Sequence, residues 1–167
     1  KWVLATACAQ LRRWAEQPET THLTMAVNIS AHQIRQDGFV DEVRTLLDCE
    51  GIQTGKLKLE LTESGLLNNI EDIIAKMTLL KTCGVCFSLD DFGTGYSSLS
   101  YLKRLPLDQL KIDQSFVRDI LSSPNAAAIT QTIVTLAHSL GLKVIAEGVE
   151  TKEQHLALFS QGCRAYQ

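Results

Sequence analysis

The sequence predicts an α/β fold in which parallel strands alternate with helices to build a (β/α) barrel. Short β-rich runs alternate with longer helical patterns, and each strand-to-strand repeat takes roughly thirty residues, as in βαβ units. The strands also alternate apolar and polar residues, and the polar faces end in carboxylate, amide or amine groups. A (β/α) barrel builds its active site from such strand ends, so these residues are expected to share one rim.

Each expected element follows from its hydrophobic period and its flanking residues. Five complete strands are expected at 24–30, 56–62, 85–89, 109–113 and 143–147. Helices are expected at 2–17, 41–50, 70–83, 98–105, 126–140 and 152–162. Pro124 or Asn125 is expected to open the long helix at 126, and Gly141 to close it.

The alternation within the strands identifies the candidate site residues. In the run KLKLELT at 56–62, the leucines fall on one face and Glu60 on the other. The remaining strands place Asn28, Asp90 and Lys111 on their polar faces, and Glu147 closes the fifth strand. A single alternating strand indicates only a half-exposed sheet, but the coincidence over five strands indicates the rim of a barrel.

Composition and charge restrict the class of protein. The 167 residues are 45% apolar and 21% charged, which is typical of one globular domain. A formal net charge of −3 provides no basic field for nucleic acid polymers or anionic membranes. No apolar run has the length of a membrane span, and no signal-peptide pattern is visible. Five cysteines, an odd number, favour reduced buried thiols and a cytoplasmic location.

The most informative segment is DDFGTGYSSL at 90–99, where two adjacent carboxylates precede a glycine-hinged loop. Alone, such a pair is typical of a solvated turn. Neighbouring carboxylates hold their charges at low cost when cations lie beside them. Together with Asn28, Glu60 and Glu147, Asp90 and Asp91 form a set of hard oxygen ligands suited to Mg²⁺ or Mn²⁺ rather than zinc.

An adjacent acid pair allows one carboxylate to bridge two metal ions, a geometry that supports phosphoryl displacement. Lys111 on the same face can stabilise charge or orient the nucleophile, or it can form a structural ion pair. Schiff-base chemistry at this lysine is disfavoured by the surrounding carboxylates. A Mg²⁺-dependent barrel enzyme of the enolase type stays open as an alternative, although one acid per strand would suit it better.

Five motifs resemble the EAL domain family and occur in that family's order along the whole chain. They are AVNIS at 26–30, LELTES at 59–64, DDFGTGYSSL at 90–99, LKIDQSF at 110–116 and AEGVET at 146–151. The resemblance implies a modified TIM (β/α)₈ barrel. It also implies a bacterial signalling hydrolase, a phosphodiesterase that uses two Mg²⁺ or Mn²⁺ ions to convert cyclic di-GMP to linear pGpG.

The resemblance also implies a role for each matching residue. Metal ligands would be Asn28, Glu60, Asp90 and Asp91, with Lys111 holding the nucleophilic water and Glu147 serving the metal–water cluster as a catalytic carboxylate. Glu63 would anchor the DFGTG loop, and further site positions would be Asp113, Glu150 and Gln167. Glu63 and Glu150 can instead cap the helices that follow them.

The tripeptide Glu-Ala-Leu, which names the family, does not occur in the sequence. Residues 1–167 are therefore expected to be a single EAL-type barrel domain truncated at both ends, without the last strand and inactive by itself. The glutamate of that tripeptide is a metal ligand in the family. Its identity would separate the phosphodiesterase from the alternative, a non-catalytic cyclic di-GMP receptor.

The expected partner is cyclic di-GMP. Flanking sensor or cyclase domains are expected in the parent protein, and a homodimer is compatible with the family. No direct membrane contact is expected from this segment, although the parent can carry a membrane anchor elsewhere.

Overall fold

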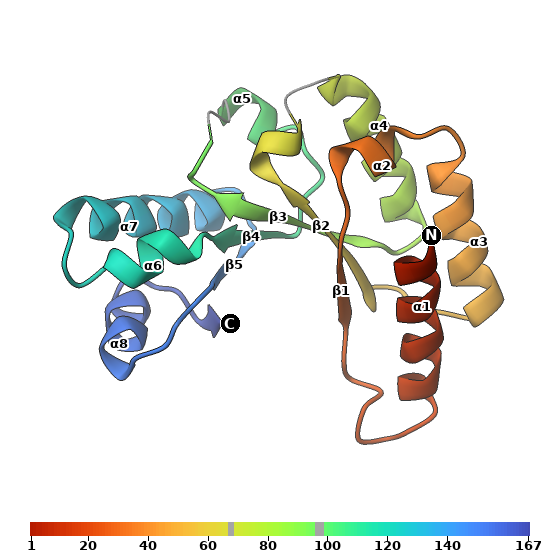
Figure 1. The fold of residues 1–167 in the computed structure, drawn as a ribbon, viewed down its shortest axis with the longest axis horizontal. Coiled ribbons are helices and arrows are strands. Elements are labelled where there is room, and N and C mark those ends of the chain that lie inside the picture. Colours follow the sequence, from red (N-terminus) through yellow and green to blue (C-terminus); the bar gives the residue numbers. More distant parts are fainter. Residues whose placement is uncertain (67–68, 96–98) are drawn as a thin grey trace. The chain divides into compact units, whose positions relative to one another are not determined.

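The computed structural model describes residues 1–66, 69–95 and 99–167 as an α/β fold (Figure 1). Its sheet has six strands in the order β1-β2-β3-β4-β5-β6. Strand β1 pairs with β2, β3 with β4, β4 with β5, and β5 with β6, and each of these pairs is parallel. The predicted parallel α/β class is confirmed.

The strands are β1 (Met25–Asn28), β2 (Leu57–Thr62), β3 (Cys86–Phe92), β4 (Gln109–Ile112), β5 (Lys143–Ala146) and β6 (Ala165–Tyr166). The helices of the N-terminal half are α1 (Trp2–Ala15), α2 (Ala31–Arg35), α3 (Phe39–Glu50), the 3₁₀ helix η1 (Glu63–Leu66) and α4 (Ile70–Thr82). Those of the C-terminal half are α5 (Leu99–Leu102), α6 (Gln114–Asp119), α7 (Pro124–Ser139) and α8 (Lys152–Ser160).

The described residues divide into two compact units. The first unit contains Lys1–Leu61, Gly65–Phe87 and Arg104–Pro106, and the second contains Thr62–Ser64, Ser88–Lys103 and Leu107–Gln167. The boundary passes through β2 and β3, so the carboxyl end of β3 belongs to the second unit. That unit holds most of the residues expected at the catalytic rim.

In the first unit, α1 packs against α3 and against β1 (Figure 1). The leucines of β2 form the centre of its core, with Leu57, Leu59 and Leu61 at most 1% exposed. Glu60, on the opposite face of β2, is also buried. A strand buried on both faces is expected in a parallel sheet, and a buried carboxylate there needs polar or cationic partners.

In the second unit, α7 packs against β4, β5 and α6. Every residue of β4 is buried, including Gln109 and Lys111 on its polar face. Because a buried ammonium group is stable only when it is paired, the burial of Lys111 requires acidic neighbours.

Three short helices were not expected from the periodicity: α2, η1 and α6. Two of them begin at side-chain caps, because Ser30 Oγ accepts a hydrogen bond from the Gln33 amide and Asp113 Oδ1 accepts one from the Ser115 amide. In α2 the Gln33 side chain also accepts from the Ser30 amide, which completes a capping box. Helices this short are specified by their caps rather than by an apolar stripe.

Several boundaries also differ from the sequence prediction. Ser123, rather than Pro124 or Asn125, is the N-cap of α7, and its side chain accepts a hydrogen bond from the Ala126 amide. Strand β3 extends to Phe92 instead of ending at Leu89, and a sixth strand begins at Ala165. Of the helix expected at 98–105, the first residue lies outside the described residues, as do Tyr96 and Ser97 of the loop motif.

The cysteines are less uniformly buried than expected. Cys8 and Cys163 are buried, whereas Cys49 is exposed and Cys83 and Cys86 are intermediate. Burial raises the pKa of the Cys8 thiol to about 11, with help from the Glu50 charge, so this thiol stays protonated at neutral pH. Among the helices within the described ranges, none combines the length and apolarity that a bilayer span needs.

Gly84 is expected to tolerate no side chain, because its φ is +85° and an added Cβ would lie 2.9 Å from Thr54 Cα. Gly51 has a φ of +61° but open space around its Cβ position, so it is the matched control. Gly84→Ala should lower the free energy of unfolding by about 1–3 kcal/mol more than Gly51→Ala does, because only the first adds overpacking to left-handed strain. Urea denaturation measures both; equal losses would contradict the close approach.

Candidate active site

The centre of the candidate site is a bulge in β3 at Asp90 and Asp91. Leu89 pairs with Leu110 and Phe92 with Ile112, so β3 advances three residues while β4 advances two. Asp91 adopts a φ of +53°, in the left-handed region that few non-glycine residues occupy. In a regular strand adjacent side chains point to opposite faces, whereas a bulge re-aims one of them. The bulge therefore allows both carboxylates to reach one site.

Three carboxylates meet at this point. Ligand oxygens of Asp90, Asp91 and Glu147 all lie within 4.8 Å of one another. Asp90 and Asp91 come from the bulge of β3, and Glu147 follows directly after β5. This clustering brings together residues that are more than fifty positions apart in the chain.

Lys111 of β4 lies between the two sides of the cluster. Its Nζ is 2.5 Å from Glu147 Oε1 and 3.2 Å from Asp90 Oδ1. Lys111 is 3% exposed, so both ion pairs are shielded from solvent and the ammonium group is held in one place. Lys111 thus forms the ion pairs that the sequence analysis allowed for it. The same position would also let its ammonium group stabilise negative charge on a ligand.

The electrostatics of Asp91 show that this cluster carries excess negative charge. Burial, and then the charges of Asp90 and Asp113, raise the pKa of the Asp91 carboxyl, and the Lys111 ammonium only partly opposes this. The Asp113 side chain acts in the same direction, because it can accept a hydrogen bond from the protonated form of Asp91. Four carboxylates next to one ammonium group favour the uptake of a cation.

The donor set fits a hard divalent cation. Its ligand atoms are all carboxylate oxygens, which suit Mg²⁺, Ca²⁺ or Mn²⁺ better than softer metals. A bound cation would also neutralise the repulsion that raises the pKa of Asp91. The acidic cluster can therefore hold a metal ion.

The loop that follows the bulge is held by Glu63, the first residue of η1. Its Oε2 accepts hydrogen bonds from the amides of Gly93 at 2.9 Å and Gly95 at 3.2 Å. Glu63 is 2% exposed, so these are buried, charge-assisted hydrogen bonds. A Cβ on Gly95 would lie 2.9 Å from the Glu63 carboxyl carbon. These hydrogen bonds join η1 to a loop that lies thirty residues further along the chain.

The bulge itself has local support. The Asp91 amide donates to Asp90 Oδ1 at 3.0 Å, and the Asp91 carbonyl accepts from Thr94 Oγ1 at 2.9 Å. Gly93 has a φ of +103°, and a Cβ there would lie 3.0 Å from the Phe116 ring and 3.1 Å from Ile133. The DFGTG sequence thus combines a strained aspartate with two glycines that leave no room for side chains.

The remaining candidate residues are placed as follows. Asp113 caps α6, and its Oδ1 also accepts a hydrogen bond from Ser115 Oγ. Gln167 lies beside the end of β5, where its amide donates to the Ala146 carbonyl at 2.9 Å. Glu150 is exposed, in the loop between β5 and α8. In the first unit, Asn28 and Glu60 are register partners across β1 and β2.

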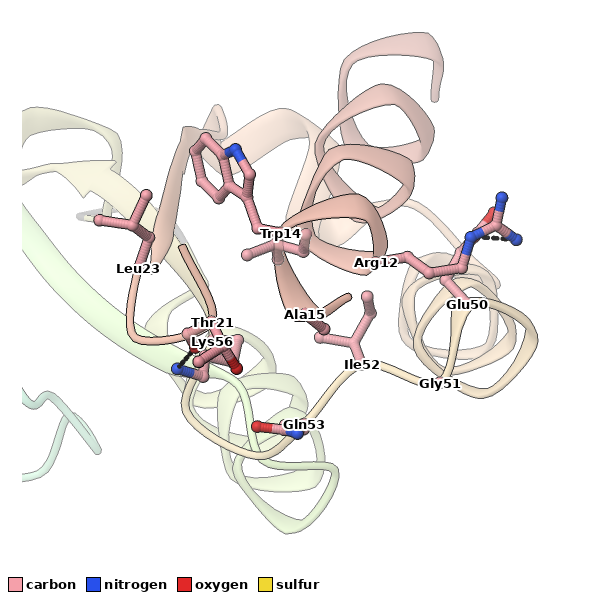
Figure 2. A pocket seen from close by; sticks show the side chains of 11 residues that line it. Arg12, Trp14, Ala15, Thr21, Leu23, Glu50, Gly51, Ile52, Gln53 and Lys56 are labelled. Carbon is pink, nitrogen blue, oxygen red and sulfur yellow. Dashed lines mark hydrogen bonds and ion pairs between the residues drawn. The ribbon is translucent and has the colours of Figure 1, made fainter. Parts of the chain in front are cut away.

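A separate hollow of about 40 Å³ lies in the first unit, between α1 and the segment after α3. Figure 2 shows Trp14 and Ile52 on its apolar walls. Its charged groups are already engaged, because Lys56 Nζ donates to the Thr21 carbonyl and Arg12 pairs with Glu50 (Figure 2). This hollow offers little polar chemistry to a ligand.

The model of the family described as "EAL domain" matches residues 1–167. The chain belongs to the EAL domain family. It is 45% identical over 166 residues to the cyclic di-GMP phosphodiesterase NbdA of Pseudomonas aeruginosa, an alignment that covers 99% of this chain and 21% of that protein. The curated relatives that this EAL chain matches are thus several times longer than the chain.

Solved EAL structures have the same fold. The PaMucR phosphodiesterase in complex with c-di-GMP superposes with a TM-score of 0.94 at 43% identity, over 99% of this chain and 67% of that one. The Klebsiella pneumoniae protein BlrP1, in a complex with manganese and c-di-GMP, superposes with a TM-score of 0.85 at 30% identity, over 98% of this chain and 42% of that one. The expected modified TIM-barrel architecture is confirmed.

Asp91→Asn is expected to stabilise the metal-free EAL chain at neutral pH. Asparagine keeps the shape of the side chain and tolerates a positive φ, but it carries no charge. Because the folded-state pKa of Asp91 is raised, repulsion in the native protein grows as the pH rises through the interval between the unfolded and the folded pKa. The melting temperature should therefore rise by about 2–4 °C at pH 7–8, and the gain should disappear below about pH 4.

The measurement is thermal unfolding in EDTA as a function of pH, with Asp48→Asn as the control for an exposed aspartate on α3. An Asp91→Asn variant that is no more stable than the unmutated protein at neutral pH would contradict the excess charge of the cluster.

Glu63→Gln is expected to weaken metal binding about tenfold, although it changes none of the carboxylates proposed to ligate the metal. The neutral amide accepts weaker hydrogen bonds from Gly93 and Gly95, so the loop beside Asp91 loses its support. Gly95→Ala should act in the same direction by displacing the carboxylate, whereas Gly141→Ala, which has open space around its Cβ, is the control. Calorimetric titration with Mn²⁺ measures the affinity. Unchanged affinity in both variants would rule out the anchoring role.

Proposed function

We propose that this chain is part of a metal-dependent phosphodiesterase that hydrolyses cyclic di-GMP to linear pGpG. The observation that carries the proposal is the bulge-built cluster of Asp90, Asp91 and Glu147, with Lys111 buried between its two sides. The EAL relatives named as cyclic di-GMP phosphodiesterases support the substrate. A half-buried acid cluster beside one buried, fixed cationic group suits displacement at a phosphate better than simple ligand capture.

Asp90 and Asp91 would hold two Mg²⁺ or Mn²⁺ ions. When bound, these ions would supply Lewis-acid activation of water and of the phosphodiester oxygens. For Asn28 and Glu60 the assignment as ligands stays a prediction from the family resemblance. Both offer the hard oxygen that these cations prefer.

Glu147 is the proposed proton acceptor. Its carboxylate lies within reach of the same point as Asp90 and Asp91, and Lys111 holds Oε1 in place. In the proposed reaction a carboxylate oxygen of Glu147 accepts the proton of the attacking water. The water oxygen bonds to phosphorus as the bond to the 3′ oxygen breaks in line with the attack, and the 3′ oxygen takes up a proton from solvent to become a hydroxyl group.

Lys111 is proposed to position the attacking water and to offset negative charge on the phosphate in the transition state. Its ammonium group is fixed by two carboxylates before substrate arrives, so little reorganisation is needed during the reaction. Asp113 and Glu63 are proposed as positioning residues, because they contact the bulge and its loop rather than the cluster centre.

For the protein as a whole, we propose a cytoplasmic bacterial signalling protein in which further domains regulate this one. The length of the relatives and the name of the bifunctional cyclase and phosphodiesterase MucR support that arrangement. A homodimer and a membrane anchor outside these residues stay compatible with it.

Lys111→Ala is expected to lower turnover of cyclic di-GMP by at least about 100-fold, as the loss of a transition-state stabiliser does. The readout is Mg²⁺- or Mn²⁺-dependent formation of pGpG by the purified protein. Lys143→Ala is the control, because Lys143 is an exposed lysine at the opposite end of β5. Near-normal rates in Lys111→Ala would contradict the assigned role. Tight binding of cyclic di-GMP without turnover by the unmutated protein would favour the receptor instead.

A further inference from the structure

The Ser88 hydroxyl on β3 is buried and has no hydrogen-bond partner among the residues that the structure describes. Ser88 is 0% exposed, so bulk solvent does not reach this group. A buried hydroxyl without a partner costs free energy, and in native proteins an ordered water commonly satisfies such a group. We propose that Ser88 holds a buried water molecule that hydrogen-bonds to the Asp90 carboxylate and fixes its orientation.

The chain pairs another fully buried hydroxyl, which makes Ser88 an exception. Thr130 of α7 is also 0% exposed. Its Oγ1 lies 2.9 Å from the Ala127 carbonyl and 2.8 Å from Gln161 Oε1. The fold thus supplies protein partners for the Thr130 hydroxyl, whereas the hydroxyl of Ser88 needs a partner of another kind.

The position of Ser88 connects it to the acidic cluster. Ser88 lies two residues before Asp90 on β3, and its register partner on the neighbouring β4 is Gln109, two residues before Lys111 (Figure 1). Side chains two residues apart on a strand share a face. The pair formed by Ser88 and Gln109 therefore lies next to the ion pair of Asp90 with Lys111, on the same face of the second unit.

The spacing along β3 suits one water molecule between the two side chains. Residues two apart on a parallel strand are about 6.6 Å from each other. That separation is too long for a direct hydrogen bond, which ends at about 3.2 Å. Two hydrogen bonds of about 2.8 Å each, through one water, span a gap of this size.

A water at this place would have enough polar partners. A buried water typically makes two to four hydrogen bonds. It would accept one from the Ser88 hydroxyl and donate one to the Asp90 carboxylate. The Gln109 carboxamide, which is 2% exposed and carries both donors and an acceptor, is the third polar group of this layer.

The water would complete the support of the Asp90 carboxylate. Its Oδ1 already accepts from the Asp91 amide at 3.0 Å and contacts Lys111 Nζ at 3.2 Å. A hydrogen bond to Oδ2 would fix the rotation of the carboxylate, and the remaining lone pairs could still ligate a cation. Ser88 is then a positioning residue. This consequence for metal binding rests on the proposed function, whereas the water itself does not.

Thermal unfolding in EDTA tests the water, because the sign of the effect decides. Ser88→Ala removes only the hydroxyl oxygen. Loss of a hydroxyl that binds water should lower the melting temperature by about 2–4 °C, whereas loss of one without a partner would raise it. Thr130→Val is the matched control, since it removes a paired buried hydroxyl and keeps the shape of the side chain. A Ser88→Ala protein that melts at or above the temperature of the unmutated protein would overturn the inference.

Calorimetric titration with Mn²⁺ tests the positioning role. Ser88→Ala should weaken Mn²⁺ binding about tenfold, as the loss of a group that orients a metal ligand does. Ser88→Cys nearly keeps the volume of the side chain but offers only a weak donor, so it should weaken binding similarly. Unmutated affinity in Ser88→Cys would indicate that Ser88 acts by packing alone and would refute the positioning role.

A crystal structure of the unmutated protein gives the direct observation. It should show a water within about 3.2 Å of both Ser88 Oγ and an Asp90 carboxylate oxygen, and Ser88→Ala should lack it. No water at that place would refute the inference. An unmutated protein that binds no Mn²⁺ would refute the proposed function, while the water and the melting temperatures would still decide this inference. Mn²⁺ binding that neither Ser88 variant alters would refute the positioning role and leave the proposed function standing.

Discussion

The bulge at Asp90 and Asp91 is the constraint on which the rest of the site depends. A regular β3 would direct these two carboxylates to opposite faces, so the pair would not converge with Glu147. The left-handed backbone of Asp91 costs about 1–2 kcal/mol. Hydrogen bonds from Thr94 and the loop held by Glu63 offset this strain. Such locally unfavourable geometry, stabilised by its surroundings, is typical of functional sites.

The charges of the site, like its backbone, are unfavourable in the metal-free protein. Burial raises the pKa of the Asp91 carboxyl, and the charges of Asp90 and Asp113 raise it further because the carboxylates outnumber the single ammonium group of Lys111. A protein selected only for stability would not bury such a set, because each unpaired charge costs free energy. The excess charge becomes favourable once a divalent cation binds. The cluster therefore lowers the stability of the metal-free protein and raises its affinity for a divalent cation, as active sites commonly do.

Much of the fold was visible in the sequence, because strand alternation and helix period are local patterns. Five strands and the longer helices were predicted to within a few residues, and Lys111 was placed on the strand that carries it, whereas Glu147 lies one residue beyond the end of β5 instead of closing it. The short helices α2 and α6 were missed, since their capping residues Ser30 and Asp113 define them more than any apolar stripe. The capping box of α8, which Thr151 and Gln154 form, was also missed, although the pattern Thr-x-x-Gln at 151–154 indicates it.

The sequence by itself determined the parallel α/β class, the chemical type of the site and the family, because residue identity and spacing along single strands are sufficient for each. Only the tertiary structure decided that Asp90 and Asp91 reach the same point. Only the structure showed which amides of the loop Glu63 binds, those of Gly93 and Gly95. These features depend on register between strands and on contacts between distant segments. Side-chain periodicity along one segment contains no information about either.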